Sequence, residues 1–276
     1  MALAPLHFVY APNHYDCASL PGDERSRVIL SRHKPDTLVI FVHGFRGDAL
    51  ETWQDFDQLV ITNPRFKNAD FIFFGYDAYL SNVLAGASFL YNLLNDLEEN
   101  PASVTSITNP NIAAARREKY KRIALVAHSL GAVVCRWAIV RAVEEGKDWR
   151  SRLRLLLFAP AHTGSDLAHL ATSAAEGFAW ISLFVQAVKA NVPLVRELDP
   201  SSRILTELAD RVSKTKNEPC LKASRVVIAE REIVVSNLPF PGDPCPDALR
   251  DTDHISVCKP SAARMKPVQY LEDLLP

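Results

Sequence analysis

The chain has 276 residues, of which 48% are hydrophobic and 23% charged, and this composition is that of an ordinary globular protein. Lys and Arg number 31 and Asp and Glu 32, so the formal net charge of −1 gives no support for a nucleic-acid partner or an anionic membrane surface. The five cysteines are odd in number and form no C-x-x-C pair, which argues against a zinc site and against a disulfide framework.

The N-terminal stretch MALAPLHFVYAPNHYD lacks the basic region and the long apolar region of a secretory signal. No apolar run reaches the roughly 20 residues that a membrane-spanning helix needs. We therefore expect a cytoplasmic protein with no transmembrane segment. The sequence predicts no particular oligomeric state.

Strands and helices are predicted to alternate along the chain. Short apolar runs typical of buried strands occur at 37–42, 70–75, 123–127, 153–158 and 225–229, with peripheral strands predicted at 7–10 and 26–32 and a short strand at 233–235. Helical spacing occurs at 49–61, 81–99, 132–143, 201–212 and 261–275, and loops are predicted at 101–110 and 236–251. These spacings permit parallel crossovers, so we predict an α/β fold with a mostly parallel central sheet, helices on both faces, and a single domain over residues 1–276.

The segment 165–200 is mostly apolar and contains Phe178, Trp180 and Phe184. Two interpretations remain open for it. It is either a helix packed on the sheet or a helical lid over a substrate pocket. A lid would favour medium acyl chains over acetyl groups in a substrate.

The catalytic nucleophile is predicted at Ser129. This serine lies between the buried strand 123–127 and the helix 132–143, on a turn that lifts its hydroxyl out of the backbone at the positive end of the helix. The local pattern is A-x-S-x-G, in which Ala127 and Gly131 supply the small residues that a tight turn needs. The alternative is a plain strand-to-helix turn without chemistry.

A serine hydroxyl needs a base within hydrogen-bond reach, and the base needs a carboxylate. We predict His254 as the base, because it follows all the predicted strands and a loop, and can fold back over the C-terminal ends of the sheet. The other histidines are expected to be structural or exposed: His7, His14, His33, His43, His128, His162 and His169.

The acid is predicted at Glu230, directly after the strand 225–229. Functional residues gather at the carboxyl ends of strands in open parallel sheets, and Glu230 occupies that place. Four other carboxylates remain alternatives, namely Glu232, Asp243, Asp253 and Asp166.

The oxyanion that forms when a serine hydroxyl attacks a carbonyl group needs hydrogen-bond donors. The backbone N–H of Leu130 is one candidate, because Leu130 follows the nucleophile and begins the helix. The backbone N–H of Phe45 is the second, because it comes directly after His43 and Gly44 at the end of a buried strand. Both are main-chain donors, so the two side chains are free to line the acyl pocket.

The segments FVHGF, AHSLG, FAPAHTGSD and DHISVCKP, in this order, resemble the α/β-hydrolase superfamily. More narrowly they resemble its lipase- and esterase-like branch, which includes GPI inositol-deacylase-like and serine-active-site proteins. The similarity covers about residues 37–260. The chain departs from this pattern at Ala127, which replaces the first glycine of the turn, and in FAPAHTGSD, where Ala159 and Ala161 differ from the usual residues around His162.

The resemblance implies an enzyme that hydrolyses carboxylic esters through an acyl-enzyme. Carried over by position, Ser129 is the nucleophile, His254 the base, and Phe45 and Leu130 the oxyanion donors. The expected substrate is a small-molecule ester or a lipid-like ester, and no metal or organic cofactor is required. A non-hydrolytic acyl-binding or signalling module of the same fold and an acyltransferase remain alternatives.

Overall fold

The computed structural model describes residues 15–20, 23–45, 47–76, 82–102, 110–116, 118–164, 197, 199–215, 218–236 and 238–275. The strand predicted at 7–10 lies outside the described residues. So does nearly all of the segment 165–200, including Phe178, Trp180 and Phe184, so that its interpretation as a lid stays a prediction.

Eight strands form a single mostly parallel sheet, as the sequence predicts. They are β1 (Tyr15–Leu20), β2 (Asp23–Ser31), β3 (Thr37–Val42), β4 (Ala69–Phe74), β5 (Arg122–His128), β6 (Leu153–Phe158), β7 (Arg225–Arg231) and β8 (Asp247–Asp253). Their order across the sheet is β1-β2-β4-β3-β5-β6-β7-β8. β2 runs antiparallel to β1 and β4, and all other neighbours are parallel, so the carboxyl ends of β3 to β8 meet at one edge.

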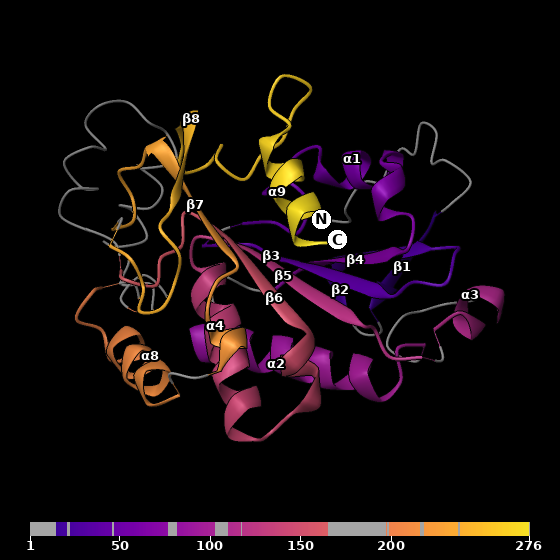
Figure 1. The fold of residues 1–276 in the computed structure, drawn as a ribbon, viewed down its shortest axis with the longest axis horizontal. Helices are drawn as coiled ribbons and strands as arrows, with labels where there is room; N and C mark the ends of the chain where they lie inside the picture. The colour runs from indigo at the N-terminus through magenta and orange to yellow at the C-terminus, as the bar shows by residue number, and fades with distance from the viewer. Residues whose placement is uncertain are drawn as a thin grey trace.

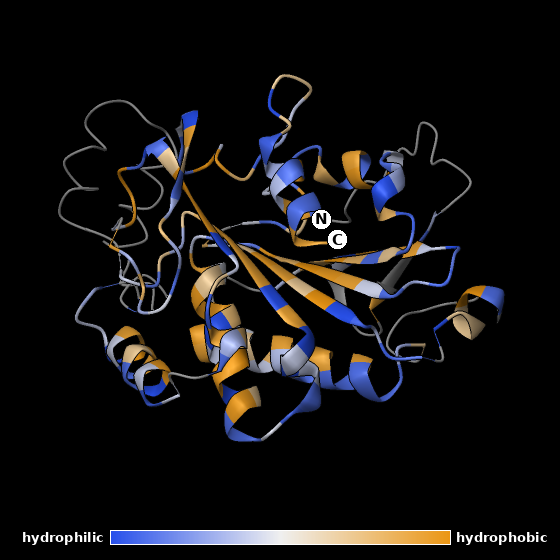
Figure 2. Cartoon of the chain, in the orientation of Figure 1, coloured by the Kyte–Doolittle hydropathy of each residue, from blue (hydrophilic) through white to orange (hydrophobic). Residues whose placement is uncertain are grey.

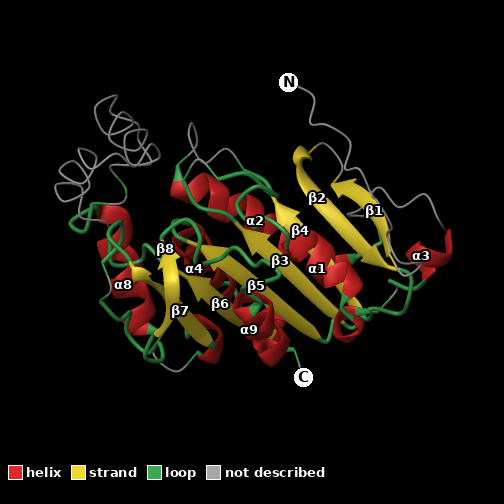
Figure 3. Cartoon of the chain, turned by 90° about the horizontal axis from the view of Figure 1, so that it is seen from above, coloured by secondary structure: helices red, strands yellow, loops and turns green. Residues whose placement is uncertain are grey.

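Helices cover both faces of this sheet. They are α1 (Phe56–Thr62), α2 (Val83–Glu99), α3 (Pro110–Ala114), α4 (Gly131–Glu144), α8 (Arg203–Lys214) and α9 (Lys266–Leu274). In Figure 1, α1 and α9 lie on one face of the sheet, and α2 and α4 lie on the other; the view from above in Figure 3 agrees. None of the helices within the described ranges is long and apolar enough to cross a membrane.

The central strands are apolar because both of their faces are covered. Every residue of β3 is buried, and in β5 only Arg122 at its start is partly exposed. Parallel strands between two helix layers have this continuous apolar character rather than an alternating one. Figure 2 shows the hydrophobic residues along these strands and on the neighbouring helices. The packing of this core fixes the positions of the carboxyl ends of β3 and β5.

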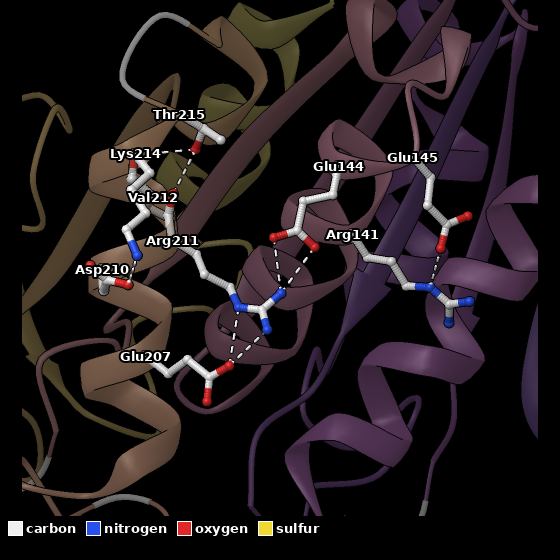
Figure 4. A network of polar contacts seen from close by, with 9 residues as sticks. All are labelled: Arg141, Glu144, Glu145, Glu207, Asp210, Arg211, Val212, Lys214 and Thr215. Atoms are coloured by element: carbon white, nitrogen blue, oxygen red, sulfur yellow. Dashed lines mark hydrogen bonds and ion pairs between the residues drawn. The ribbon is translucent and has the colours of Figure 1, made fainter.

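An ion-pair network joins α8 to α4 on the outer side of the helix layer (Figure 4). The Arg211 guanidinium of α8 contacts Glu207 one turn earlier, at 2.8 Å, and the Glu144 carboxylate of α4, at 2.9 and 3.0 Å. These side chains are about a third or more exposed, so each pair contributes at most about 1 kcal/mol. The network orients α8 rather than holding the fold together.

The structure differs from the prediction at several elements. β1 (Tyr15–Leu20) forms where no strand is predicted, and the predicted strand 233–235 is not a strand of the sheet. The helix predicted at 49–61 begins only at α1, because residues 49–55 form turns in which Gln54 has a φ of 50°. The loop predicted at 101–110 ends on the short helix α3. The loop predicted at 236–251 contains the start of β8, whose sequence DALRDTD buries only Leu249 and Thr252 because this strand is the edge of the sheet.

Candidate active site

Ser129 lies on a strained turn between β5 and α4. Its φ is 53°, in the left-handed region that non-glycine residues seldom adopt. Backbone hydrogen bonds to the neighbouring chain after β6 hold the turn: the Ser129 N–H donates to the Phe158 carbonyl at 3.0 Å, and the Ala161 N–H donates to the Ser129 carbonyl at 3.1 Å. The turn therefore points the hydroxyl away from the sheet, as the A-x-S-x-G pattern predicts.

Two glycines allow the turn to approach β3 closely. A Cβ placed on Gly131 would lie 2.2 Å from the Val42 carbonyl oxygen, and one on Gly44 would lie 2.8 Å from the Ser129 Cβ. Only glycine fits at such distances. The contact at Gly44 brings the turn that carries Phe45 directly against Ser129.

The Gly131→Ala substitution should therefore destabilise the protein strongly. The added methyl group would overlap the backbone of Val42 and His43, which cannot turn aside as a side chain can, so we expect a loss of about 3 kcal/mol in the free energy of unfolding. The measurement is the urea midpoint. The comparison variant is Gly146→Ala, because the Cβ added there meets no atom within 4 Å. Its φ of 67° is unfavourable for alanine, so we expect a loss of only about 1 kcal/mol in the free energy of unfolding. Equal midpoints for Gly131→Ala and the unaltered protein would contradict the packing described.

The structure brings Ser129, His254 and Glu232 into one hydrogen-bonded chain. The His254 Nε2 lies 3.1 Å from the Ser129 Oγ, and its Nδ1 lies 3.0 and 3.1 Å from the two carboxylate oxygens of Glu232. A carboxylate accepts, so Nδ1 carries the proton and donates it to Glu232. The Nε2 lone pair then faces the serine hydroxyl, which is the geometry of a general base.

The Glu232 side chain is held rigidly beside the imidazole. Its carboxylate is fully buried, and Oε1 also accepts the backbone N–H groups of Val234 at 2.9 Å and Val235 at 3.3 Å. Buried carboxylate oxygens need such hydrogen-bond partners to offset the water they lose. The short turn after β7 thus fixes the orientation of Glu232 before any substrate binds.

The predicted acid Glu230 is not at the imidazole. It lies at the exposed end of β7, where Oε2 accepts the backbone N–H of Asp251 at 2.9 Å. The register between β7 and β8 shifts at this point, and Asp251 has a φ of 56°. Glu230 therefore stabilises an irregularity of β8, and Glu232, one of the alternatives, occupies the place expected for Glu230.

The remaining carboxylate alternatives have other partners or lie elsewhere. Asp243 is buried in an ion pair with Arg136 of α4 and accepts the Ala223 N–H at 2.8 Å. Asp253 accepts from the backbone and hydroxyl of Ser256 and closes the turn that follows β8. Asp166 lies outside the described residues.

His128, directly before Ser129, holds the backbone of His254. Its Nε2–H donates to the His254 carbonyl at 2.8 Å, and the two rings pack with centroids 4.9 Å apart. Burial, and next the nearby His254, lowers the pKa of His128 to about 3, so its ring is neutral. The sequence pattern indicated only a turn residue at this position, and no signal in it pointed to the contact.

His43 plays a similar part in the turn after β3. Its Nδ1–H donates to the Gly44 carbonyl at 2.9 Å, its Nε2 accepts the Tyr76 N–H at 3.4 Å, and its ring stacks on the Tyr76 ring at 4.5 Å. Burial lowers the pKa of His43 as well. These contacts fix the turn that presents Phe45, while Leu130 occupies the N-terminal end of α4.

His162 is not part of the hydrogen-bonded series Ser129, His254 and Glu232. Its ring packs against Phe240 with centroids 4.7 Å apart, and burial holds its pKa well below the usual value. Among the described residues, no group of three or more His, Cys, Asp or Glu side chains is arranged to hold a metal ion.

The three buried neutral histidines make stability sensitive to acid. His43, His128 and His162 have pKa values lowered in the folded protein, whereas the unfolded chain takes up protons on them below about pH 6.5. The contribution of the neutral histidines to the free energy of unfolding is therefore complete above about pH 6.5. It is lost as the pH falls from there toward the pKa values that the histidines have in the folded protein. We expect a slope approaching about 4 kcal/mol per pH unit if all three contribute.

Urea unfolding between pH 7.5 and 5 measures this slope. His162→Gln removes one of the three groups and should reduce the slope by about a third. A free energy of unfolding that does not change between pH 7 and 5 would contradict the neutral state of these rings.

A family model described as "Putative serine esterase (DUF676)" matches residues 32–160. This range includes the Ser129 turn, Phe45 and Leu130, but neither His254 nor Glu232. The match supports a serine hydrolase of ester substrates. No curated protein matches the chain significantly.

Solved structures of α/β-hydrolases, lipases and esterases among them, share this fold. The mature lipase BlEst2 of Bacillus licheniformis is 14% identical with a TM-score of 0.56, and the match covers 96% of this chain and 99% of that one. Esterase B from Lactobacillus rhamnosis, in complex with a tributyrin phosphonate inhibitor, is 10% identical with a TM-score of 0.53, over 96% and 86% of the two chains. The peroxisomal α/β-hydrolase Lpx1 of Saccharomyces cerevisiae is 10% identical with a TM-score of 0.53, over 96% and 90%. The predicted α/β-hydrolase fold is confirmed.

Proposed function

Because this chain has the α/β-hydrolase fold and its residues 32–160 match a serine esterase family, we propose that it hydrolyses carboxylic esters through an acyl-enzyme. The observation that carries the proposal is the uninterrupted line of hydrogen bonds from the Ser129 Oγ through the His254 ring to the Glu232 carboxylate. Such a line converts a weak hydroxyl nucleophile into a reactive one. No step of the proposed reaction needs a metal or an organic cofactor.

In the first half of the reaction the Ser129 Oγ attacks the ester carbonyl carbon while its proton passes to the His254 Nε2. The imidazolium that forms is stabilised by the Glu232 carboxylate on its Nδ1–H. The carbonyl π electrons move onto oxygen, which becomes the oxyanion. When the oxyanion collapses, the bond to the alcohol oxygen breaks, and His254 returns its proton to that oxygen.

The oxyanion is assigned to the backbone N–H groups of Phe45 and Leu130. Leu130 is the N-cap residue directly before α4, at the end of the helix where the first N–H groups lack partners within the helix and the helix dipole favours negative charge. The contact between Gly44 and Ser129 supports Phe45 as the second donor, because it brings the adjacent peptide to the nucleophile. Two such donors stabilise the charge as it develops.

In the second half water replaces the alcohol. His254 removes a proton from water, the hydroxide oxygen attacks the acyl carbon, and the bond to the Ser129 Oγ breaks. The proton on His254 then returns to Ser129, and the carboxylic acid leaves. The same residues would serve acyl transfer if an alcohol took the place of water.

A fluorophosphonate probe tests the proposal against a non-hydrolytic binding module. Such probes react with serines activated by a base, so the unaltered protein should be labelled, while Ser129→Ala should not be labelled and His254→Ala only at a strongly reduced rate. Intact-protein mass spectrometry gives the stoichiometry, and circular dichroism confirms that each variant is folded. No labelling of the folded, unaltered protein would overturn the proposal in favour of a binding module.

A further inference from the structure

The segment that carries His254 begins at the edge of the sheet. His254 directly follows β8, which is the edge strand, and the pairing of β8 with β7 is irregular. Only two residues of β8 are buried. Elements with few buried contacts open locally at a low cost in free energy. A stable position for the imidazole therefore requires contacts between this segment and the interior of the protein.

Two hydrogen bonds from the described residues supply such contacts. The Cys258 thiol donates to the Thr52 carbonyl at 3.4 Å, and the His128 Nε2–H donates to the carbonyl of His254 itself at 2.8 Å. His128 is the last residue of β5, which lies between β3 and β6 at the centre of the sheet. Ser129 comes directly after it, so the base and the serine are both held at the end of the same strand.

The His128 side chain suits this role. Its ring is buried and neutral, so it has a single N–H, and the carbonyl acceptor places that N–H on Nε2. Water competes little for a hydrogen bond at a buried site. The His128 and His254 rings also pack together with centroids 4.9 Å apart. The contact thus fixes the backbone of His254 without using either nitrogen of the His254 ring.

The contact between Ser129 and His254 changes during the proposed reaction. Before acylation the serine hydroxyl donates to the His254 Nε2, at an Oγ–Nε2 distance of 3.1 Å. In the acyl-enzyme the Oγ is an ester oxygen and has no proton to donate. The imidazole then loses one of its two side-chain contacts just when it has to orient a water molecule. The bonds to Glu232 and from His128 do not depend on the state of Ser129.

We propose that His128 is a positioning residue for deacylation, because its hydrogen bond to the His254 carbonyl keeps the imidazole in place beside the acylated serine. The proposal rests on the hydrolase function proposed above. It predicts that deacylation depends on His128 more strongly than acylation does, since the Ser129 hydroxyl helps to hold the ring during acylation only. A displacement of about 1 Å at such a site is enough to slow a reaction markedly.

The test measures the two halves of the reaction separately with p-nitrophenyl butyrate. The initial burst of p-nitrophenol gives the acylation rate, and quenching followed by intact-protein mass spectrometry gives the acylated fraction and hence the deacylation rate. His128→Phe keeps a ring but has no donor. We expect it to slow deacylation by about tenfold or more and acylation by about threefold or less, so that the acyl-enzyme accumulates. Fluorophosphonate labelling reports only the attack by Ser129 and should follow the acylation rate.

Two further variants separate the hydrogen bond from the packing of the ring. The amide nitrogen of His128→Gln is as many bonds from the backbone as the imidazole Nε2, so this variant should restore deacylation to within about threefold. The amide of His128→Asn is one carbon shorter and should leave deacylation as slow as in His128→Phe. His128→Asn also replaces His128→Phe if the latter does not fold. The matched control is His162→Phe, at a buried histidine that packs against Phe240, and it should keep the ratio of the two rates.

An unchanged ratio of deacylation to acylation in His128→Phe or His128→Asn, or no recovery in His128→Gln, would overturn the positioning role. The hydrolase function would stand in each of these cases, because the unaltered protein would still be acylated and labelled. If the unaltered protein releases no p-nitrophenol and the fluorophosphonate leaves Ser129 unlabelled, the hydrolase function fails and this proposal fails with it.

Discussion

Replacing Ser129 by alanine is expected to lower kcat for short p-nitrophenyl esters by about 10⁵-fold or more. The alanine retains the backbone turn but has no oxygen to form the acyl-enzyme, so only binding and the oxyanion donors remain to assist water. The measurement is kcat with p-nitrophenyl butyrate under conditions that detect the uncatalysed rate.

The fold should survive this change, since the hydrogen bonds that hold residue 129 come from its backbone. The thermal midpoint therefore serves as the check on folding. Ser213→Ala, in which a helix hydroxyl that donates to the Asp210 carbonyl is removed, is the matched control and should keep full activity. Turnover that persists in Ser129→Ala would refute the assignment of the nucleophile.

Glu232→Gln is expected to lower kcat by about 10⁴-fold. The amide can donate its N–H to the His254 Nδ1, which places the ring proton on Nε2. The imidazole then donates toward the Ser129 Oγ instead of accepting its proton, so the base is lost although the geometry is kept. The measurement is kcat for the same ester, with KM expected to change little because Glu232 does not touch the substrate.

Glu230→Gln is the matched control, because the same isosteric change is made two residues earlier. Its carboxylate contacts only the Asp251 N–H within the described residues, so kcat should stay within a few-fold, with a loss of stability of about 1 kcal/mol. If Glu230→Gln abolished turnover and Glu232→Gln did not, Glu230 would be the acid after all.

The central part of the fold could be predicted from sequence because burial leaves a clear pattern. The runs 37–42, 123–127 and 153–158 are apolar along their whole length, and each became a strand of the sheet centre. β8 could not be found this way. An edge strand with only two buried residues carries no apolar pattern, and its pairing with β7 depends on contacts distant in sequence.

The residues of the candidate site also fall into those that a local sequence pattern predicts and those that depend on contacts distant in sequence. The turn at Ser129 was predictable because strand, small residues and helix are adjacent in the chain. The choice between Glu230 and Glu232 was not, because both follow the same strand and differ only in where the chain leaves it. The register shift between β7 and β8 decides which of the two reaches the imidazole, and no local pattern encodes that shift.

The register shift also constrains how homologous chains can differ in length. β8 leads directly into His254, and its irregular pairing with β7 is held by Glu230 at Asp251. Inserting or deleting one residue between 247 and 253 would rotate the imidazole away from Ser129, whereas the exposed stretch around Leu238 and Pro239 has no such connection. Related enzymes should therefore vary in length before β8 and keep the number of residues within it.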